Sequence, residues 1–80
     1  MFHKMAREAF ENHLKCAANM SASQGLAADH ELGMALGLAH YALFAGDITH
    51  TESTLMFHRV QAVRSGRIVR ICQEARMAAA

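Results

Sequence analysis

The run Leu32–Ala45 constrains this chain more than any other stretch. Its fourteen residues are all apolar or glycine, except His40. Leu, Ala and Met favour helix, and the run has no β-branched residue and no proline, so it predicts a helix rather than a buried strand. It is shorter than the roughly 18 apolar residues that a membrane span needs. Because a helix that is apolar on all sides is normally buried on all sides, we expect the rest of the chain to surround it.

The length of the chain limits how completely this helix can be covered. Eighty residues form one small domain with a thin core, and oligomerisation is a common way to complete such a core. Gly33 and Gly37 lie inside the predicted helix, where each costs about 1 kcal/mol relative to Ala, so close packing against a neighbour is the expected compensation. We therefore expect residues 1–80 to form a single helical domain that is completed by homodimerisation.

An amphipathic helix is predicted before the central run, from residue 2 to about residue 20. Its apolar face consists of Phe2, Ala6, Ala9, Phe10, His13, Ala17 and Met20, and charged residues occupy the other face. A polar segment at residues 21–25 follows this helix. Ser21 and Gln24 have the spacing of a capping box, in which each side chain bonds the backbone N–H of the other residue. This segment therefore predicts the start of the central helix, with Ser23 as an alternative N-cap.

A second turn is predicted after the central run, at the residues GDITxxE (46–52). Gly46 is placed to end the central helix, and Thr49 with Glu52 has the spacing of another capping box, so a third helix should begin near His50. This turn is locally similar to the hairpin of the short SHOCT-type bacterial oligomerisation domains. Ser53 departs from that pattern, because those domains usually carry an aromatic residue there. We interpret the resemblance as shared turn chemistry.

The third helix has a conflict of phase. Apolar residues at 56, 57, 60 and 63 mark one face, and a straight continuation would put Arg64 and Arg67 in the middle of the face that Ile68 and Ile71 continue. Because Gly66 can end or kink a helix, we predict a break or bend there, followed by a segment that buries Ile68, Ile71 and Cys72. The predicted fold is all-α: a small bundle of three helices, the third bent or broken near Gly66.

Charge is distributed unevenly along the sequence. Residues 1–57 carry three basic and six acidic side chains, whereas residues 58–80 carry five arginines and one glutamate. Since arginine pairs well with carboxylates and phosphates, this segment suits a protein partner or nucleic acid. The alternative is that the same arginines pair with the acidic half of their own chain. The residues predicted to bind a partner are Arg59, Arg64, Arg67 and Arg70.

Histidine and cysteine side chains raise the question of a metal site. His13 and Cys16 are three residues apart on one helix and could share a metal ion, but a closed zinc site would need two more ligands from distant residues such as His58 or Cys72. We prefer a histidine bonded to a carbonyl and a cysteine that acts as a small apolar residue, and predict no metal. His40 is expected to be neutral and hydrogen-bonded across a helix or dimer contact, with a pH switch as the alternative.

The sequence favours a protein that is not an enzyme and that has no cofactor. It contains neither a nucleophile placed beside an oriented base nor a glycine-rich phosphate loop. The charged N-terminus lacks a signal-peptide pattern and the two cysteines lack a disulfide pattern, so we expect a cytoplasmic location. The expected function is a small adaptor or inhibitor, of the kind that phages and mobile elements encode, which binds a protein through the C-terminal arginines. The alternative is a nucleic-acid-binding regulator that uses Arg59–Arg76 with weak sequence specificity.

Overall fold

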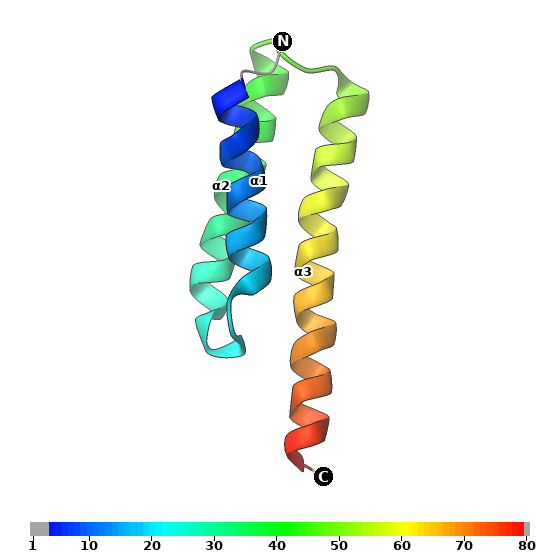
Figure 1. The fold of residues 1–80 in the computed structure, drawn as a ribbon. Coiled ribbons are helices and arrows are strands. Elements are labelled where there is room, and N and C mark those ends of the chain that lie inside the picture. The colour runs from blue at the N-terminus through cyan, green and yellow to red at the C-terminus, as the bar shows by residue number, and fades with distance from the viewer. Residues whose placement is uncertain (1–3, 80) are drawn as a thin grey trace.

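The computed structural model describes residues 4–79 and consists of three packed α-helices (Figure 1). Helix α1 spans Lys4–Asn19, α2 spans Gly25–Phe44 and α3 spans His50–Ala79, and a short 3-10 turn, η1, spans Ala22–Gln24. Helices α1 and α2 form an antiparallel hairpin, and α3 lies beside it. Residues 4–79 contain no strand and no helix long and apolar enough to cross a membrane. The predicted all-α bundle of three helices is confirmed, while the predicted start at Phe2 lies outside the described residues.

Both predicted capping boxes are present at the turns between the helices. At the first turn, the Ser21 N–H donates to Oε1 of Gln24 at 3.0 Å. At the second, the Thr49 N–H donates to Oε1 of Glu52 and the Glu52 N–H donates to Oγ1 of Thr49, each at 3.1 Å. These bonds satisfy backbone donors that the first turn of a helix leaves unpaired. The Thr49–Glu52 box marks the start of α3, and the Ser21–Gln24 box lies at the start of η1, directly before α2.

Gly46 ends α2 in the predicted manner. Its φ of +76° lies in the left-handed region that favours glycine. The Gly46 N–H donates to the Leu43 carbonyl at 3.1 Å, and the Asp47 N–H donates to the Ala42 carbonyl at 2.9 Å. This pair of bonds is the Schellman motif, which closes the last turn and redirects the chain toward α3.

The core between the three helices is thin and rich in alanine. Half of the ten buried apolar side chains in the described residues are alanines, and they lie mainly on α2. Small side chains let helix axes approach closely, but they contribute little buried apolar area. The buried apolar residues are Phe10, Leu14, Ala17, Ala28, Leu32, Ala35, Ala39, Ala42, Ile48 and Val60.

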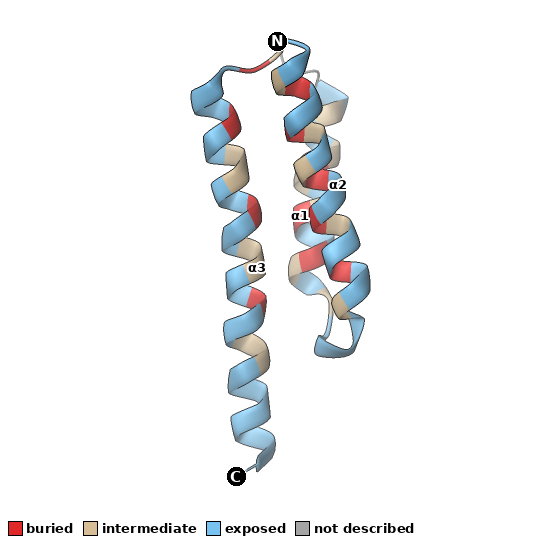
Figure 2. Cartoon of the chain, turned by 180° about the vertical axis from the view of Figure 1, so that it is seen from behind, coloured by how far each residue is buried: buried red, intermediate tan, exposed pale blue. Residues whose placement is uncertain are grey.

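Helix α2 is buried along one side only, so within residues 4–79 the rest of the chain does not surround it. Buried residues recur along one side of the helix, and the rest of each turn is exposed or half-buried (Figure 2). Leu26, Tyr41 and Phe44 are 89%, 72% and 88% exposed. The physical reason is that the chain supplies only two neighbouring helices, and both pack against the same side of α2.

Helix α3 continues through Gly66, so the predicted break is wrong. All thirty residues of His50–Ala79 form one α-helix. Arg67 does occupy the face that packs against the hairpin and is only 7% exposed, but its guanidinium has polar partners at the end of α1. The helix therefore has no need to turn Arg67 away from its neighbours. As a consequence Ile68, which was expected to be buried, is 57% exposed, and Ile71 is half-buried.

Candidate functional site

Arg67 caps the C-terminal end of α1 from a distant part of the chain. The last four carbonyls of a helix lack partners within the helix, and the last turn of α1 contains no basic residue. One nitrogen of Arg67, Nη1, donates to the Ala17 carbonyl at 3.0 Å and to the Met20 carbonyl at 2.6 Å. The other, Nη2, donates to the Ser21 carbonyl at 3.2 Å. The planar guanidinium thus satisfies three carbonyls at once, which a lysine ammonium could not match in geometry.

Arg70 completes this cap one turn further along α3. Its guanidinium donates to the Ala18 carbonyl at 2.9 Å and also to the Met20 carbonyl. The C-terminal end of a helix carries a partial negative charge, which favours two cations in this position. Together Arg67 and Arg70 fasten α3 to the turn between α1 and α2.

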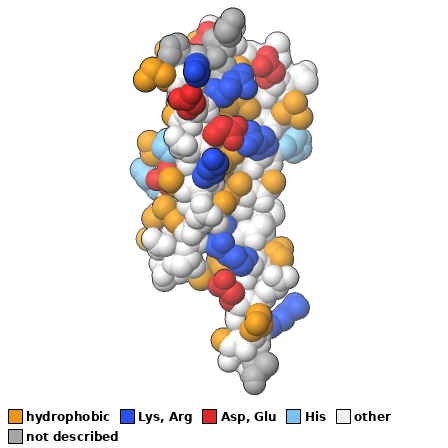
Figure 3. Space-filling view, in the orientation of Figure 1, with side chains coloured by type: hydrophobic (Ala, Val, Ile, Leu, Met, Phe, Trp, Pro, Cys, Tyr) orange, Lys and Arg blue, Asp and Glu red, His pale blue; other side chains and the backbone are white. Residues whose placement is uncertain are grey.

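Arg59 is paired with the acidic half of the chain. Its guanidinium donates to both carboxylate oxygens of Glu11, with Nη2 to Oε2 at 2.6 Å, and lies 5.6 Å from the centre of the Phe10 ring. The hydrogen bonds from Arg59 lower the pKa of Glu11 below its ordinary value, and the same bonds raise the pKa of Arg59. Figure 3 shows the resulting mixture of acidic and basic side chains on the face where α1 and α3 are in view.

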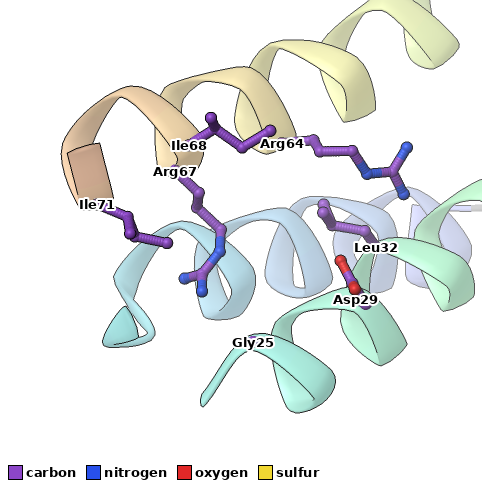
Figure 4. Close-up of a pocket in the computed structure, with 7 residues that line it drawn as sticks. All are labelled: Gly25, Asp29, Leu32, Arg64, Arg67, Ile68 and Ile71. Atoms are coloured by element: carbon purple, nitrogen blue, oxygen red, sulfur yellow. The ribbon is translucent and has the colours of Figure 1, made fainter. Parts of the chain in front are cut away.

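An open groove of about 330 Å³ lies between the first turns of α2 and the second half of α3. Leu32, Ile68 and Ile71 make its apolar surface, and Asp29 and Arg64 contribute a charge from each helix (Figure 4). The remaining lining residues are Gly25 and Arg67. We call this feature the α2–α3 groove, and it combines apolar contact area with charges of both signs.

Beside this groove, α3 projects past the end of the helical hairpin (Figure 1). At 1.5 Å per residue, the thirty residues of α3 extend about 45 Å, whereas the sixteen of α1 extend about 24 Å. Residues 72–79 are all exposed, although Met77 and several alanines among them are apolar. The projecting end is therefore a helix that has no neighbour within residues 4–79 to cover it.

Two of the four arginines that were predicted to bind a partner line the α2–α3 groove. Arg64 lies at its edge and donates to Oε1 of Gln61 at 3.3 Å, while Arg67 is directed toward α1 (Figure 4). Arg59 and Arg70 lie outside the groove and bind groups of their own chain. The structure thus brings Arg64 and Arg67 together at the groove. Of these two cations, Arg67 is bound to the end of α1 and Arg64 is not.

The histidines and cysteines do not assemble into a metal site within residues 4–79. His13 Nδ1 lies 2.5 Å from Oε2 of Glu31, a carboxylate partner rather than the expected carbonyl. Cys16 is a free thiol on the surface, as is Cys72. His40 is exposed rather than buried, and its ring centre lies 4.8 Å from that of Phe57.

Asp29 was not expected to contribute to a binding surface. It lies near the start of α2, where the helix dipole favours an acidic side chain. Its position in the α2–α3 groove depends on how α3 crosses the hairpin, which no local pattern encodes. The one local signal for this region was the phase conflict at Arg64 and Arg67, because charges on an apolar face mark a place that needs a tertiary explanation.

The chain matches no protein-family model, no curated protein and no solved structure in the three comparisons. The similarity of residues 46–52 to SHOCT-type turns therefore rests on the turn residues alone.

Proposed function

We propose that this chain is a non-enzymatic protein-interaction module whose α2–α3 groove binds a helical segment of a protein partner. The observation that carries this proposal is the groove itself, where exposed Ile68 lies beside the uncovered end of α3. Apolar patches bordered by charged residues are typical of protein interaction surfaces. A small adaptor or inhibitor of phage or mobile-element type fits such a surface.

The chemistry of the groove defines the kind of partner. An amphipathic helix that lies in a groove uses apolar side chains about one turn apart, and Ile68 and Ile71 offer contacts for them beside the buried Leu32. Arg64 would pair with an acidic side chain of the partner. The expected partner is therefore an amphipathic helix that carries an acidic side chain beside its apolar stripe.

The test is a pull-down from lysate with matched variants of α3. Ile68→Asp places a charge in the groove, and Leu55→Asp makes the same change at a residue of equal exposure, 59% against 57%, outside the groove. A stoichiometric protein that wild type and Leu55→Asp capture, and that Ile68→Asp loses, would support the proposal. Equal capture by all three would place the binding surface elsewhere, and the absence of any stoichiometric partner would count against the module.

The contacts of the arginines favour this function over nucleic-acid binding. Arg59 already binds Glu11, and Arg67 and Arg70 bind backbone carbonyls, so a nucleic acid would have to compete with the chain's own groups. Each phosphate contact that is lost in this way reduces the electrostatic affinity. A fluorescence-anisotropy titration with random DNA at low salt tests the alternative, and tight binding would restore it.

We also propose that the module is a homodimer. The three helices leave one side of α2 uncovered. The total accessible surface, 5533 Å², exceeds the roughly 4,800 Å² expected for a folded monomer of 8.8 kDa. The uncovered side of α2 and the projecting end of α3 both contribute to this excess. Size-exclusion chromatography with light scattering tests the proposal, and a monomer of 8.8 kDa would contradict it.

A further inference from the structure

We infer that α2 pairs with α2 of a second copy through its exposed side, in an antiparallel arrangement centred at the level of Ala35. This inference rests on the proposed homodimer and deepens it, because it names the surface and the register. The surface, which we call the outer face of α2, consists of Leu26, His30, Gly33, Gly37, Tyr41 and Phe44, all of them exposed.

The outer face has enough apolar area for a dimer contact. An aromatic side chain can bury about 150–250 Å², so Tyr41 and Phe44, at 72% and 88% exposure, offer about 300 Å² between them. Leu26, at 89% exposure, and the helix surface at the glycines raise this to roughly 500 Å² per copy. Two copies would then bury about 1,000 Å², the lower limit for a specific interface. The area therefore fits a second copy of this chain and a dimer of moderate affinity.

The outer face is nearly symmetric about its midpoint: a large apolar side chain lies at each end, and a glycine lies on either side of the centre. Leu26 and Phe44 are eighteen residues apart, or five full turns, so they project from the same side of α2 about 27 Å apart. Gly33 and Gly37 lie two residues on either side of the midpoint, Ala35. A two-fold axis at this midpoint would place Leu26 of one copy against Phe44 of the other, and the glycines of both copies at the centre. A symmetric dimer requires this kind of self-complementary surface.

The glycines are explained by a neighbouring helix but not by the chain's own packing. A Cβ atom added at Gly33 or Gly37 would meet no other atom within 4 Å, so the monomer gives no steric reason for glycine at either position. Each glycine nevertheless costs about 1 kcal/mol of helix stability relative to alanine. Two crossing helices are closest at the crossing point and diverge away from it, so they need small residues at the centre and large ones at the ends. The outer face has this distribution.

The polar residues beside the outer face are also complementary in this arrangement. At 100° per residue, the two-fold axis brings Asp29 of one copy opposite His40 of the other, and His30 opposite Tyr41. A carboxylate would face an imidazole, and an imidazole would face a phenol, so each polar group gains a partner of suitable chemistry. A parallel arrangement would instead bring each residue opposite its own copy. The polar residues thus favour the antiparallel register.

The first experiment tests the surface with a matched pair of glycine variants. In sedimentation equilibrium at about 100 µM, wild type should have twice the mass of one chain, 8.8 kDa. Gly37→Leu should raise the dimer dissociation constant at least tenfold, whereas Gly66→Leu, also in an open position within a helix, should leave it unchanged. Helical content by circular dichroism checks that both variants fold. If Gly37→Leu does not fold, Phe44→Glu provides the same test of the surface.

The outcomes separate this inference from the proposals on which it rests. A monomeric wild type would overturn both the homodimer and the inference. A dimer that Gly37→Leu and Phe44→Glu leave intact would overturn the outer face while keeping the homodimer. Residue 68 lies on α3, so the Ile68→Asp variant should remain dimeric even if it no longer captures the partner. Partner binding at the groove is thus tested independently of the dimer.

The second experiment tests the register by cross-linking in a background that lacks both native thiols, Cys16→Ser with Cys72→Ser. Chains with Leu26→Cys are mixed with chains that carry Phe44→Cys and are treated with a short bis-maleimide. The antiparallel arrangement predicts cross-links between the two kinds of chain in large excess over links between identical chains, because the Leu26 positions would lie about 27 Å apart along the helices. Links mainly between identical chains would indicate parallel pairing and overturn the register.

Discussion

At the residue scale, Arg67 is a buried cation whose partners are carbonyl oxygens rather than a carboxylate. It is 7% exposed and donates to three carbonyls, that of Ala17 in the last turn of α1 and those of Met20 and Ser21 directly after the helix. A buried charge is costly unless hydrogen bonds and local charge compensate it, and here the negative end of the α1 dipole supplies both. These partners lie 46 to 50 residues away in the sequence, so no local pattern could identify them. The sequence revealed only that Arg67 conflicts with the apolar face.

Replacing Arg67 with methionine should lower the free energy of unfolding by about 2–3 kcal/mol, because several carbonyls lose their donors. Arg67→Lys should fall between this value and wild type, since an ammonium lacks the planar fork of the guanidinium. Urea unfolding followed by circular dichroism measures both. Arg64→Met is the control, and its cost should stay within about 0.5 kcal/mol. An equal cost at both positions would contradict the capping function of Arg67.

Ser53 is expected to respond in the opposite direction. It is buried, and its hydroxyl has no hydrogen-bond partner among the residues that the structure describes. Ser53→Ala should therefore raise the free energy of unfolding by about 1 kcal/mol more than Ser65→Ala, an exposed serine of the same helix. Both substitutions replace serine with alanine within α3, so the gain in helix propensity is the same in both and cancels in the comparison. Equal effects in thermal or urea unfolding would show that the Ser53 hydroxyl is solvated.

At the scale of the elements, the helix ends could be predicted from the sequence but the course of α3 could not. Caps depend on residues three to six positions apart, so Ser21 with Gln24, Thr49 with Glu52 and the stop at Gly46 were all correct. Whether a helix continues through a glycine depends on its tertiary contacts. At Gly66 the buried Val60 before the glycine and the contacts of Arg67 and Arg70 after it hold both sides of the glycine against the hairpin.

The two glycines should therefore respond oppositely to the same substitution. Gly46→Ala should lower the free energy of unfolding by about 1 kcal/mol, because φ of +76° strains any residue with a Cβ atom. Gly66→Ala should raise it by up to about 1 kcal/mol, because alanine favours helix and meets no atom within 4 Å there. Urea midpoints of the two variants measure this difference. A loss of stability at Gly66 would mean that α3 bends there in solution.

At the scale of the whole molecule, the sequence could identify an apolar central helix but not which side of it a single chain covers. Apolar character on all sides of residues 32–45 is a property of the sequence, whereas coverage depends on where α1 and α3 pack. The same limit applies to the charges. The excess of arginine near the C-terminus was evident, but the pairing of Arg59 with Glu11 joins residues 48 positions apart.

Removing residues 74–80 should leave the stability of the fold nearly unchanged, so its effect on partner capture can be measured separately. Residues 74–79 are all exposed, and the shortened chain keeps Arg67 and Arg70, so the free energy of unfolding should change by less than about 1 kcal/mol. Partner capture should weaken if the bound helix extends along the projecting end of α3. Urea unfolding and the pull-down measure the two quantities on the same protein. A large loss of stability would show that the projecting end is covered in solution.

The alanine-rich core has a thermal consequence. The heat capacity of unfolding arises largely from apolar surface that becomes exposed, and alanine contributes little of it. Five of the ten buried apolar residues are alanines. The heat capacity change of unfolding of a single chain should therefore fall below the usual value of about 12–15 cal/mol/K per residue. A small heat capacity change of unfolding makes the free energy of unfolding depend less steeply on temperature. The free energy of unfolding should therefore change little on cooling as well as on moderate warming, without a sharp optimum near room temperature.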